Sequence, residues 1–337
     1  MAKRIRIIHY GVGAIGSEIV RLAAQRKDLR ITGALDTARE KVGKDLGLVS
    51  GWSKRLGVTV GNKPERILQQ GKADVVIHST RSSLARIMPE LERCIEAGMN
   101  VVSTCEELSY PQASHPRLAR RLDDLARKHQ VTVLGTGVNP GFVMDVLALA
   151  LTAPCHDVRR IKITRVVDSA LRRIQLQRKT GASLAVEEFQ EKAKQGIIRH
   201  VGLRESMMMV ADGLGWKLSE VKESVEPVVA EKTRRSKFFE VPKGRVAGVR
   251  QVVSGMRGGE EAIRLELEIS IGAEDPRDAV LIEAQPNMDM VIRGGVFGDT
   301  ATAAIALNCV PRVLQAAPGL ATMRDLPLVF QCGSARP

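Results

Sequence analysis

The chain has 337 residues, more than one hydrophobic core usually organises, so we expect two domains or one domain with a large insertion. With 44% hydrophobic and 26% charged residues, it is not a mainly disordered protein. The net charge of +13 would suit a nucleic acid, an anionic membrane or a phosphate-bearing ligand. Aromatic residues are only 3%, however, which argues against single-strand nucleic-acid binding, and the basic residues are scattered in short pairs. We interpret the positive charge as a solvated basic surface and expect no nucleic-acid partner.

The cysteines and histidines predict neither disulfides nor a metal site. The five cysteines form no C-x-x-C pair, and the six histidines show no H-x-H or H-E-x-x-H spacing. The amino-terminal residues lead directly into a strand-like pattern without an apolar leader, and no segment approaches the roughly 20 apolar residues of a membrane span. These features favour a cytoplasmic protein that does not bind a membrane.

Short β-branched runs alternate with helical patterns in the first third of the chain, as in a parallel sheet covered by helices. Apolar residues recur at helical spacing between the runs, for example at Leu84, Ile87 and Leu91. The predicted strands are Arg4–His9, Arg30–Leu35, Ala73–His78, Asn100–Ser103 and Val131–Leu134. The expected fold is an open α/β sheet.

Beyond Gly141 the strand-like stretches become longer and predict a second domain. Ile263, Leu265 and Leu267 alternate with charged residues, which indicates a sheet with one buried and one wet face, either antiparallel or mixed. We expect the Met207–Met209 run to fill a core. The predicted strands are Arg160–Asp168, Lys217–Val229, Gly244–Met256, Ile263–Ile271 and Ala279–Ala284, and helical patterns cover Leu184–Gly196 and Thr300–Leu314.

A glycine-rich loop follows the first predicted strand and opens an amphipathic helix. In this setting Gly11 permits a tight turn, Gly13 lets the backbone approach a pyrophosphate, and Gly16 allows close packing of helix on strand. The N–H groups of Ala14 and Ile15 lie at the start of the helix, where an anion binds favourably. The pattern predicts a dinucleotide-binding loop.

The second strand ends in an acidic residue about where such a loop requires one. Asp36 is placed to bond a ribose 2′-hydroxyl, with Thr37 beside it, and its carboxylate favours NAD. Arg39, Lys41 and Lys44 follow, and a cation here can instead accommodate the extra phosphate of NADP. These cations equally suit an exposed basic face, so the choice between NAD and NADP stays open.

Ligands of open α/β sheets collect outside the carboxyl ends of the strands, so the residues that follow the later strands are further candidates. We predict that they contribute to cofactor binding, although serine and threonine at a strand end often only cap the next helix. They are Ser79 and Thr80, then Ser103, Thr104 and Cys105, and finally Asn139 and Pro140 in a loop of small residues.

Glu106 and Glu107 follow the fourth predicted strand. Adjacent carboxylates cannot both face the same way, so we expect one to point toward the ligand and the other to cap a turn or meet solvent. A partly buried carboxylate has a raised pKa that suits general acid–base catalysis. The sequence does not decide which of the two is catalytic, and both also suit the N-terminal end of a turn.

The glycine loop, Ser103–Pro111 (STCEELSYP), Gly135–Asp145 (GTGVNPGFVMD) and Ala317–Pro327 (APGLATMRDLP) together resemble the 2,4-diaminopentanoate dehydrogenase family. This family is similar in fold to dihydrodipicolinate reductase and includes native NAD(P)-dependent amine dehydrogenases. The likeness covers nearly the whole chain. The His-His and K-x-D-A-P-S-G-T segments of dihydrodipicolinate reductase itself are absent, which speaks against lysine biosynthesis.

The resemblance implies a Rossmann doubly wound parallel sheet plus an α+β substrate domain with a mixed or antiparallel sheet. We expect a dinucleotide-binding domain over 1–145, a substrate and dimerisation domain over 146–298, and a C-terminal helix and tail over 299–337 that returns to the first domain. It also implies a homodimer that exchanges an amine for a carbonyl in the presence of ammonia and NAD(P)H. Glu106 or Glu107 would accept a proton from ammonium. Candidate substrate residues are Phe142, Met144, Arg165 and His200, with Arg172 and Arg173 as further cations for a substrate carboxylate.

Three other functions remain possible on the same fold. A reductase of a cyclic imine or of a dihydrodipicolinate-type acid would work without ammonia, as would a dehydrogenase of a hydroxy compound. A non-catalytic nucleotide-sensing protein would bind the cofactor and tolerate the loss of both glutamates.

Overall fold

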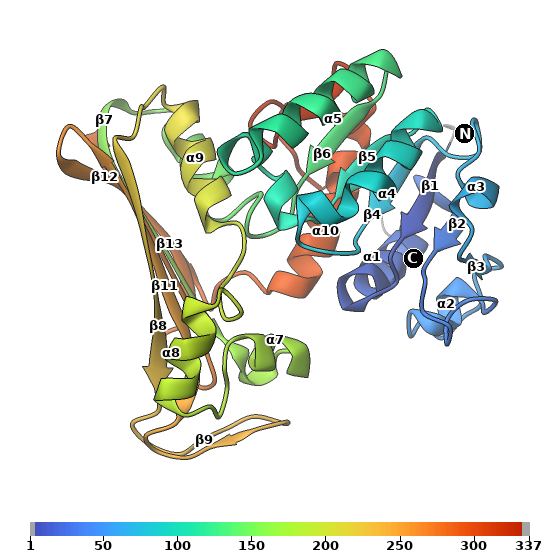
Figure 1. Ribbon diagram of the computed structural model, residues 1–337. Helices are drawn as coiled ribbons and strands as arrows, with labels where there is room; N and C mark the ends of the chain where they lie inside the picture. The colour runs from blue at the N-terminus through green and yellow to red at the C-terminus, as the bar shows by residue number, and fades with distance from the viewer. Residues whose placement is uncertain (1–3, 332–337) are drawn as a thin grey trace. The chain divides into compact units, whose positions relative to one another are not determined.

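The computed structural model describes residues 4–331, which form two compact units (Figure 1). The first unit contains residues 4–142 and 297–331, and the second contains residues 143–296. No helix within the described residues is long and apolar enough to cross a membrane.

A parallel sheet of seven strands forms the centre of the first unit, and the predicted α/β sheet is confirmed. Its spatial order is β15-β6-β5-β4-β1-β2-β3, so the order reverses at β1, with β2 on one side and β4 on the other. The strands are β1 (Ile5–Tyr10), β2 (Leu29–Leu35), β3 (Val60–Gly61), β4 (Val75–His78), β5 (Asn100–Ser103), β6 (Thr132–Gly135) and β15 (Gly319–Ala321).

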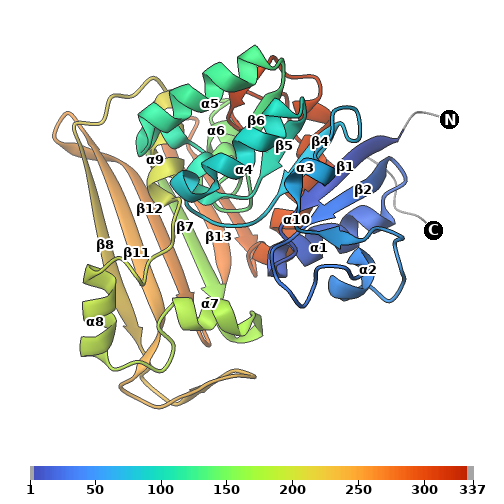
Figure 2. The same cartoon turned by 45° about the vertical axis from the view of Figure 1, so that its right-hand side comes forward.

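Helices cover both faces of this sheet, giving three layers (Figure 2). One face packs against α4 and α5 through a core that contains Val76, Leu91, Val101 and Leu122. The other face packs against α1 and α10, which also contact each other. The helices are α1 (Ala14–Gln25), α2 (Leu46–Val49), α3 (Pro64–Ile67), α4 (Leu84–Glu96), α5 (Pro116–Lys128) and α10 (Gly298–Val313), with 3-10 turns η1 (Glu106–Leu108) and η2 (Pro111–Ala113).

Two strands of the first sheet were not predicted from the sequence. β3 has only two residues, and β15 lies in the Pro- and Gly-rich segment that follows α10. The N–H of Leu320 in β15 donates to Asp123 Oδ1 on α5 at 2.8 Å. Both strands depend on pairing with a distant partner, because neither is long enough to show a pattern of its own.

A mixed sheet of six strands forms the second unit, in the order β14-β13-β7-β12-β11-β8. β7 and β12 are parallel and every other neighbouring pair is antiparallel. The strands are β7 (His156–Asp168), β8 (Glu220–Val229), β11 (Val246–Arg257), β12 (Glu260–Ser270), β13 (Arg277–Gln285) and β14 (Met288–Arg293); β9 (Arg234–Arg235) and β10 (Glu240–Val241) form a separate hairpin. All five predicted strands are present and β14 is additional.

One face of the second sheet packs against helices of the same unit. α9 contacts β11 and β12, and α8 contacts β8, on the same side in Figure 1. Met207 and Met209 are fully buried in α9, which confirms the prediction that the methionine run fills a core. The remaining elements are α6 (Val146–Leu151), η3 (Ser169–Leu171), α7 (Ile174–Lys179), α8 (Val186–Lys194) and α9 (Leu203–Gly213).

The opposite face of the second sheet carries alternating charged and apolar side chains. Glu266 lies within reach of Lys162, Arg250 and Arg264, and Leu281 on β13 is 42% exposed.

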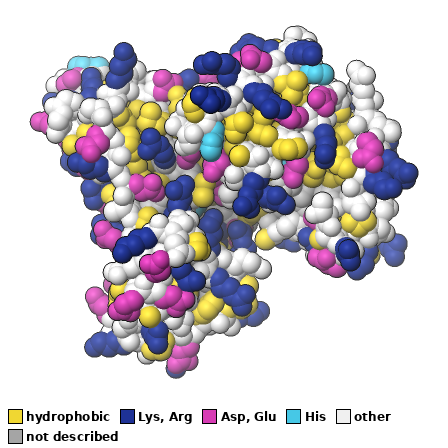
Figure 3. All heavy atoms as spheres, viewed as in Figure 1, with side chains coloured by type: hydrophobic (Ala, Val, Ile, Leu, Met, Phe, Trp, Pro, Cys, Tyr) yellow, Lys and Arg dark blue, Asp and Glu magenta, His cyan; other side chains and the backbone are white. Residues whose placement is uncertain are grey.

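Over the face of the molecule in Figure 3, lysine and arginine side chains are interspersed with acidic and neutral ones rather than gathered into one patch.

Candidate functional site

The carboxyl ends of β1, β2, β4, β5 and β6 bring most of the predicted site residues to one edge of the first sheet. β1 leads into the glycine loop, β2 into Asp36, β4 into Ser79 and β5 into the turn with both glutamates. Because the strand order reverses between β4 and β1, this edge has the topology at which α/β proteins bind ligands.

Two of the three glycines of the loop meet steric demands that a residue with a Cβ could not satisfy. Gly11 has φ of 97°, and a Cβ there would lie 2.5 Å from the carbonyl oxygen of Ser79 on β4. A Cβ on Gly16 would overlap the carbonyl of Gly11. Gly13 differs, because it is exposed and a Cβ on it would meet nothing. The first and third glycines therefore shape the loop, while the second leaves open space over it.

Two side chains hold the Gly11 carbonyl. His9 on β1 donates from Nε2 at 2.9 Å, and the Ser79 hydroxyl donates at 2.8 Å. His9 is buried, and its other ring nitrogen, Nδ1, has no hydrogen-bond partner among the described residues. Burial is the largest influence and lowers the pKa of His9 to about 4, so the ring is neutral near pH 7.

The Asp36 carboxylate connects the end of β2 to the glycine loop. Oδ2 accepts the N–H of Val12 at 2.7 Å, and Oδ1 accepts the N–H of Ala38 at 2.8 Å. Lys41 Nζ lies 3.4 Å from Oδ2. Partial burial opposes ionisation, but the two N–H donors and Lys41 outweigh it and lower the pKa of Asp36. The carboxylate is thus ionised and fixed beside the loop.

These residues fit a nicotinamide dinucleotide. The helix α1 begins at Ala14 with no capping side chain and no acidic residue in its first turn, and a Cβ on the N-cap residue Gly13 would meet nothing. Such a helix start favours a pyrophosphate. Asp36 supplies an acceptor for a ribose hydroxyl.

A buried relay of hydrogen bonds connects β4, β5 and α4. Glu90 Oε2 lies 2.8 Å from His78 Nε2, and His78 Nδ1 lies 2.9 Å from Ser103 Oγ. The N–H of Cys105 donates to the same Ser103 oxygen at 3.2 Å. Burial opposes ionisation of Glu90, but the bonds from His78 and Thr80 outweigh it and lower its pKa. Although carboxylate, imidazole and hydroxyl follow one another as in a hydrolytic triad, Ser103 is fully buried, so the relay positions the backbone of the turn after β5.

That turn is held from three sides. The relay fixes the start of the turn. The Cys105 thiol donates to the Ser82 carbonyl. Burial raises the pKa of this thiol, so it keeps the proton that it donates. Glu107 Oε2 accepts the N–H of Leu84, the first residue of α4, at 2.7 Å and lies 3.0 Å from His115 Nε2. A Cβ on Gly135 of β6 would overlap the backbone of Leu108, so β6 packs directly beneath the turn. Glu106, next to this anchored carboxylate, is half-buried.

The loop after β6 is buried and also tied to α10. Val138 N–H donates to Thr302 Oγ1 at 3.3 Å, and Asn139 and Pro140 are both buried. Phe142, the last residue of this part of the first unit, is half-buried. The predicted cofactor residues of this loop thus share the carboxyl edge with those of β1, β4 and β5.

The other predicted substrate residues lie in the second unit. Arg165 donates to Asp278 Oδ1 at 2.6 Å and to the Val296 carbonyl at 2.8 Å, and both partners of the ion pair are buried. Burial lowers the pKa of Arg165 against the opposing effect of Asp278. The backbone of His200 is held by Gln251, and Met144 is fully buried. A role for these residues toward substrate stays a prediction.

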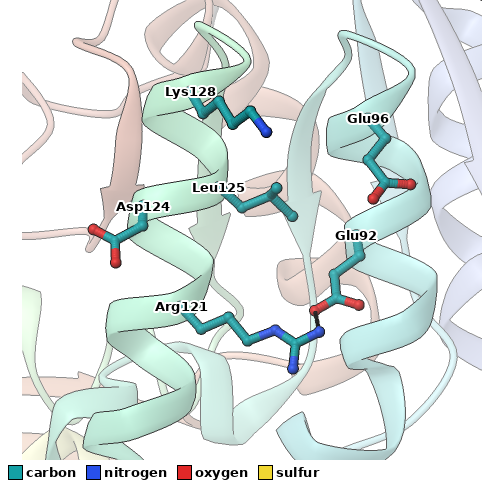
Figure 4. A pocket seen from close by; sticks show the side chains of 6 residues that line it. All are labelled: Glu92, Glu96, Arg121, Asp124, Leu125 and Lys128. Atoms are coloured by element: carbon teal, nitrogen blue, oxygen red, sulfur yellow. Dashed lines mark ion pairs between the residues drawn. The ribbon is translucent and has the colours of Figure 1, made fainter.

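A surface groove between α4 and α5 is separate from this site. Glu92 and Glu96 line it from α4 and Leu125 from α5, and Glu92 pairs with Arg121 at 2.7 Å (Figure 4). The two glutamates lie in the last turns of α4, just before β5 begins, so the groove lies near the amino end of β5 rather than at the carboxyl edge. Within the described residues, no group of three or more His, Cys, Asp or Glu side chains is arranged to hold a metal.

Sequence reasoning missed His9 and Glu90 at this edge, and it took His78 only as part of the strand end with Ser79 and Thr80, not as a member of a relay. A buried histidine in each of two adjacent parallel strands was the available signal, because such strands are otherwise apolar. Glu90 gave no signal, since it is one of several charged residues along α4.

Comparison with known proteins agrees with this architecture. The family model of the 2,4-diaminopentanoate dehydrogenase C-terminal domain matches residues 142–334, and that of the dihydrodipicolinate reductase N-terminus matches residues 5–109. The chain is 33% identical to 2,4-diaminopentanoate dehydrogenase of Acetoanaerobium sticklandii over 97% of this chain and 94% of the relative. It is 21% identical to an amine dehydrogenase of Streptomyces virginiae, over 96% of each chain. The structure of amine dehydrogenase from Mycobacterium smegmatis superposes with a TM-score of 0.86 at 25% identity, over 97% of each chain.

The glycine loop, the open start of α1 and the fixed Asp36, together with these matches, define an NAD(P)-dependent oxidoreductase of the dehydrogenase class. More narrowly, the chain belongs to the 2,4-diaminopentanoate dehydrogenase family.

The buried His9 makes stability depend on pH. Its pKa is about 4 in the folded protein, against about 6.5 in the unfolded chain, so the unfolded state gains a proton first as pH falls. We expect a loss of stability between pH 6.5 and 4 of up to about 3 kcal/mol from this group. Urea unfolding of His9→Gln should show a flatter pH dependence than the wild type in this window. The exposed His156→Gln is the control, and equal slopes for all three proteins would contradict the assignment.

Removing one partner of the buried Arg165–Asp278 ion pair should strongly destabilise the protein. Asp278→Asn leaves the buried guanidinium uncompensated, at a cost of about 3 kcal/mol in unfolding free energy. The double variant Arg165→Met with Asp278→Leu should recover most of this loss, which chemical denaturation measures. If Asp278→Asn is as stable as the wild type, the pair does not stabilise the unit.

Proposed function

We propose that this enzyme catalyses reversible reductive amination: a ketone or amino-ketone, ammonia, a proton and reduced nicotinamide cofactor give an amine, water and oxidised cofactor. The position of the turn after β5 supports this most directly. β5 is two strands from β1 in the sheet, so the turn begins about 10 Å from the glycine loop. A dinucleotide whose pyrophosphate lies at the loop has the length to bring its nicotinamide toward this turn.

We assign the catalytic carboxylate to Glu106. Glu107 already anchors the turn through Leu84 and His115. Successive residues of a 3-10 turn point about 120° apart, so a Glu107 that faces α4 directs Glu106 elsewhere. Half-burial suits a general base.

In this mechanism Glu106 accepts a proton from ammonium, and the resulting ammonia attacks the carbonyl carbon of the substrate. The protonated carboxyl then returns the proton to the departing hydroxyl, so that water leaves and a protonated imine forms. The bound cofactor supplies the hydride that reduces this imine. The relay from Glu90 to Cys105 and the contact of Gly135 with the turn keep Glu106 in place, which is the positioning that such a reaction requires.

The first test separates the two glutamates. In Glu106→Gln the carboxamide cannot accept a proton, so ammonium-dependent turnover should fall by about 100-fold or more while NADH affinity stays unchanged. Glu107→Gln retains an acceptor for the Leu84 N–H and should keep turnover within about tenfold of the wild type. The assay follows oxidation of NADH and of NADPH with short ketones and amino-ketones, with and without ammonium.

Each other outcome has a defined meaning. Loss of activity in Glu107→Gln alone would exchange the two roles. Turnover without ammonium would indicate a ketone or imine reductase, the alternative that the dihydrodipicolinate reductase match of residues 5–109 favours. Cofactor binding with no turnover on any substrate would favour a nucleotide-sensing protein.

We also propose a homodimer formed by the face of the second sheet that lies opposite α8 and α9. No helix of the described second unit packs on this face, as Figure 1 shows. Leu281 and Val291 are exposed on it, while cations such as Lys162 and Arg264 are paired with Glu266, which lowers the cost of desolvating them. A broad face with apolar residues and matched charges is typical of a subunit interface.

If this face forms the dimer, substitution of Leu281 should disrupt the dimer without unfolding the subunit. Leu281→Glu places a carboxylate opposite Lys162 on β7, which the monomer tolerates, but burying it at an interface is unfavourable. Sedimentation velocity should show a shift from dimer to monomer. Gln195→Glu on the exposed end of α8 is the control. A wild-type monomer, or a Leu281→Glu variant that stays dimeric, would contradict this interface.

We further propose a reducing cellular compartment such as the cytoplasm. Cys94, Cys105 and Cys309 are buried, and none of the cysteines in the described residues forms a disulfide. Burial strongly raises the pKa of Cys94 and Cys105, so these thiols are unreactive core residues.

A further inference from the structure

The groove between α4 and α5 has two charged walls with an apolar side chain between them. Its volume is about 400 Å³, which is within the usual range of small-molecule sites. Glu92 and Glu96 line it from α4, and Arg121 and Lys128 line it from α5. Leu125 points into the space between the two walls (Figure 4). A small molecule in this groove meets opposite charges on its two sides and an apolar surface between them.

The charges are paired at one end of the groove and open at the other. Glu92 pairs with Arg121 at 2.7 Å, which closes the first end. At the other end, Glu96 and Lys128 point toward each other in Figure 4, but neither forms an ion pair within residues 4–331. Asp124 also borders the groove, but its carboxylate points away from it. One carboxylate and one ammonium group are therefore left for a ligand.

The ends of both helices lie beside this open pair. Glu96 is the last residue of α4 and Lys128 the last of α5, and the two helices run in the same direction along the groove. The final carbonyl groups of a helix carry a partial negative charge that favours a cation. Lys128 is such a cation for α5, whereas the carboxylate of Glu96 adds a like charge at the end of α4. An ammonium group beside Glu96 compensates both the carboxylate and the helix end.

We infer that the groove between α4 and α5 is a second ligand site, which binds a small zwitterion of the α-amino acid type with an apolar side chain. The ammonium group of the zwitterion lies at Glu96, its carboxylate at Lys128, and its side chain on Leu125. A molecule that carries only one of these charges leaves the other protein group without a partner, so both charges contribute to binding.

The two helices that form the groove also hold the turn after β5. Glu107 Oε2 accepts the N–H of Leu84, the first residue of α4, at 2.7 Å and lies 3.0 Å from Nε2 of His115, the residue that precedes α5. The groove and the turn thus lie at opposite ends of the same helix pair. A zwitterion that bridges Glu96 and Lys128 ties the carboxyl-terminal ends of the helices together. Because each helix is a rigid element, this contact restricts the amino-terminal ends that Glu107 holds, and with them the turn.

Calorimetric titration of the full chain with leucine tests the site without turnover. Leucine should bind with a Kd of about 1 mM. 4-Methylpentanoate and 3-methylbutylamine, which each keep one of its two charges, should bind about tenfold more weakly or worse. Glu96→Gln and Lys128→Met should each raise the Kd for leucine about tenfold or more. Lys194→Met, the same substitution at the exposed last residue of α8, is the control and should leave the Kd unchanged.

Hydrogen exchange gives a second readout, at the turn itself. Saturating leucine should slow exchange of the amides of residues 103–108 about threefold or more in the wild type and in Lys194→Met, but not in Lys128→Met. Unchanged exchange in a wild type that binds leucine would overturn the link between the groove and the turn.

Three binding results would overturn the site. They are a Kd for leucine above about 10 mM, equal binding of either singly charged analogue, and groove variants that bind leucine as well as the wild type. In the last case, a Kd that rises in Glu106→Gln instead would place leucine at the catalytic turn. None of these measurements requires turnover, so their outcome is distinct from a failure of reductive amination.

Discussion

The carbonyl of Gly11 is the point from which the rest of the cofactor edge is organised. It accepts hydrogen bonds from His9 on its own strand and from Ser79 on the neighbouring strand β4. Since Gly11 lacks a Cβ, the two strands meet backbone to backbone where the order of the sheet reverses. With that carbonyl turned toward β4, the next N–H, of Val12, turns toward Asp36, and α1 begins with its N–H groups uncovered. The buried Nδ1 of His9 has no hydrogen-bond partner among the described residues, which costs about 1–3 kcal/mol of stability.

The same principle recurs at β5, where side chains from neighbouring elements hold a short segment of backbone. The relay from Glu90 through His78 and Ser103 ends on the N–H of Cys105, so its effect is on the turn and not on a nucleophile. Each polar group in it has a partner, which makes the network rigid in a low dielectric environment. Glu106 lies in this turn beside Glu107, which Leu84 and His115 hold in place.

Much of the fold was readable from the sequence because its signals are local. The five predicted strands of the first sheet are present, and so are the five predicted strands of the second, with small differences at their ends. The glycine loop and Asp36 were readable for the same reason, since their spacing reflects one strand–helix–strand unit. β3 and β15 were not, because two or three residues hold no periodicity and both strands exist only through pairing with β2 and β6.

The chemistry of the site was less readable because it depends on partners far away in the chain. Arg165 stands in the sequence as a cation without a neighbour of opposite charge, yet the antiparallel register of β7 and β13 places Asp278, 113 residues later, directly opposite. The two adjacent glutamates look equivalent until Leu84 and His115 are brought to one of them by the packing of α4 and of the segment before α5. In each case the residue type shows that a charge must be satisfied, and only the tertiary contacts show whether the protein or a ligand satisfies it.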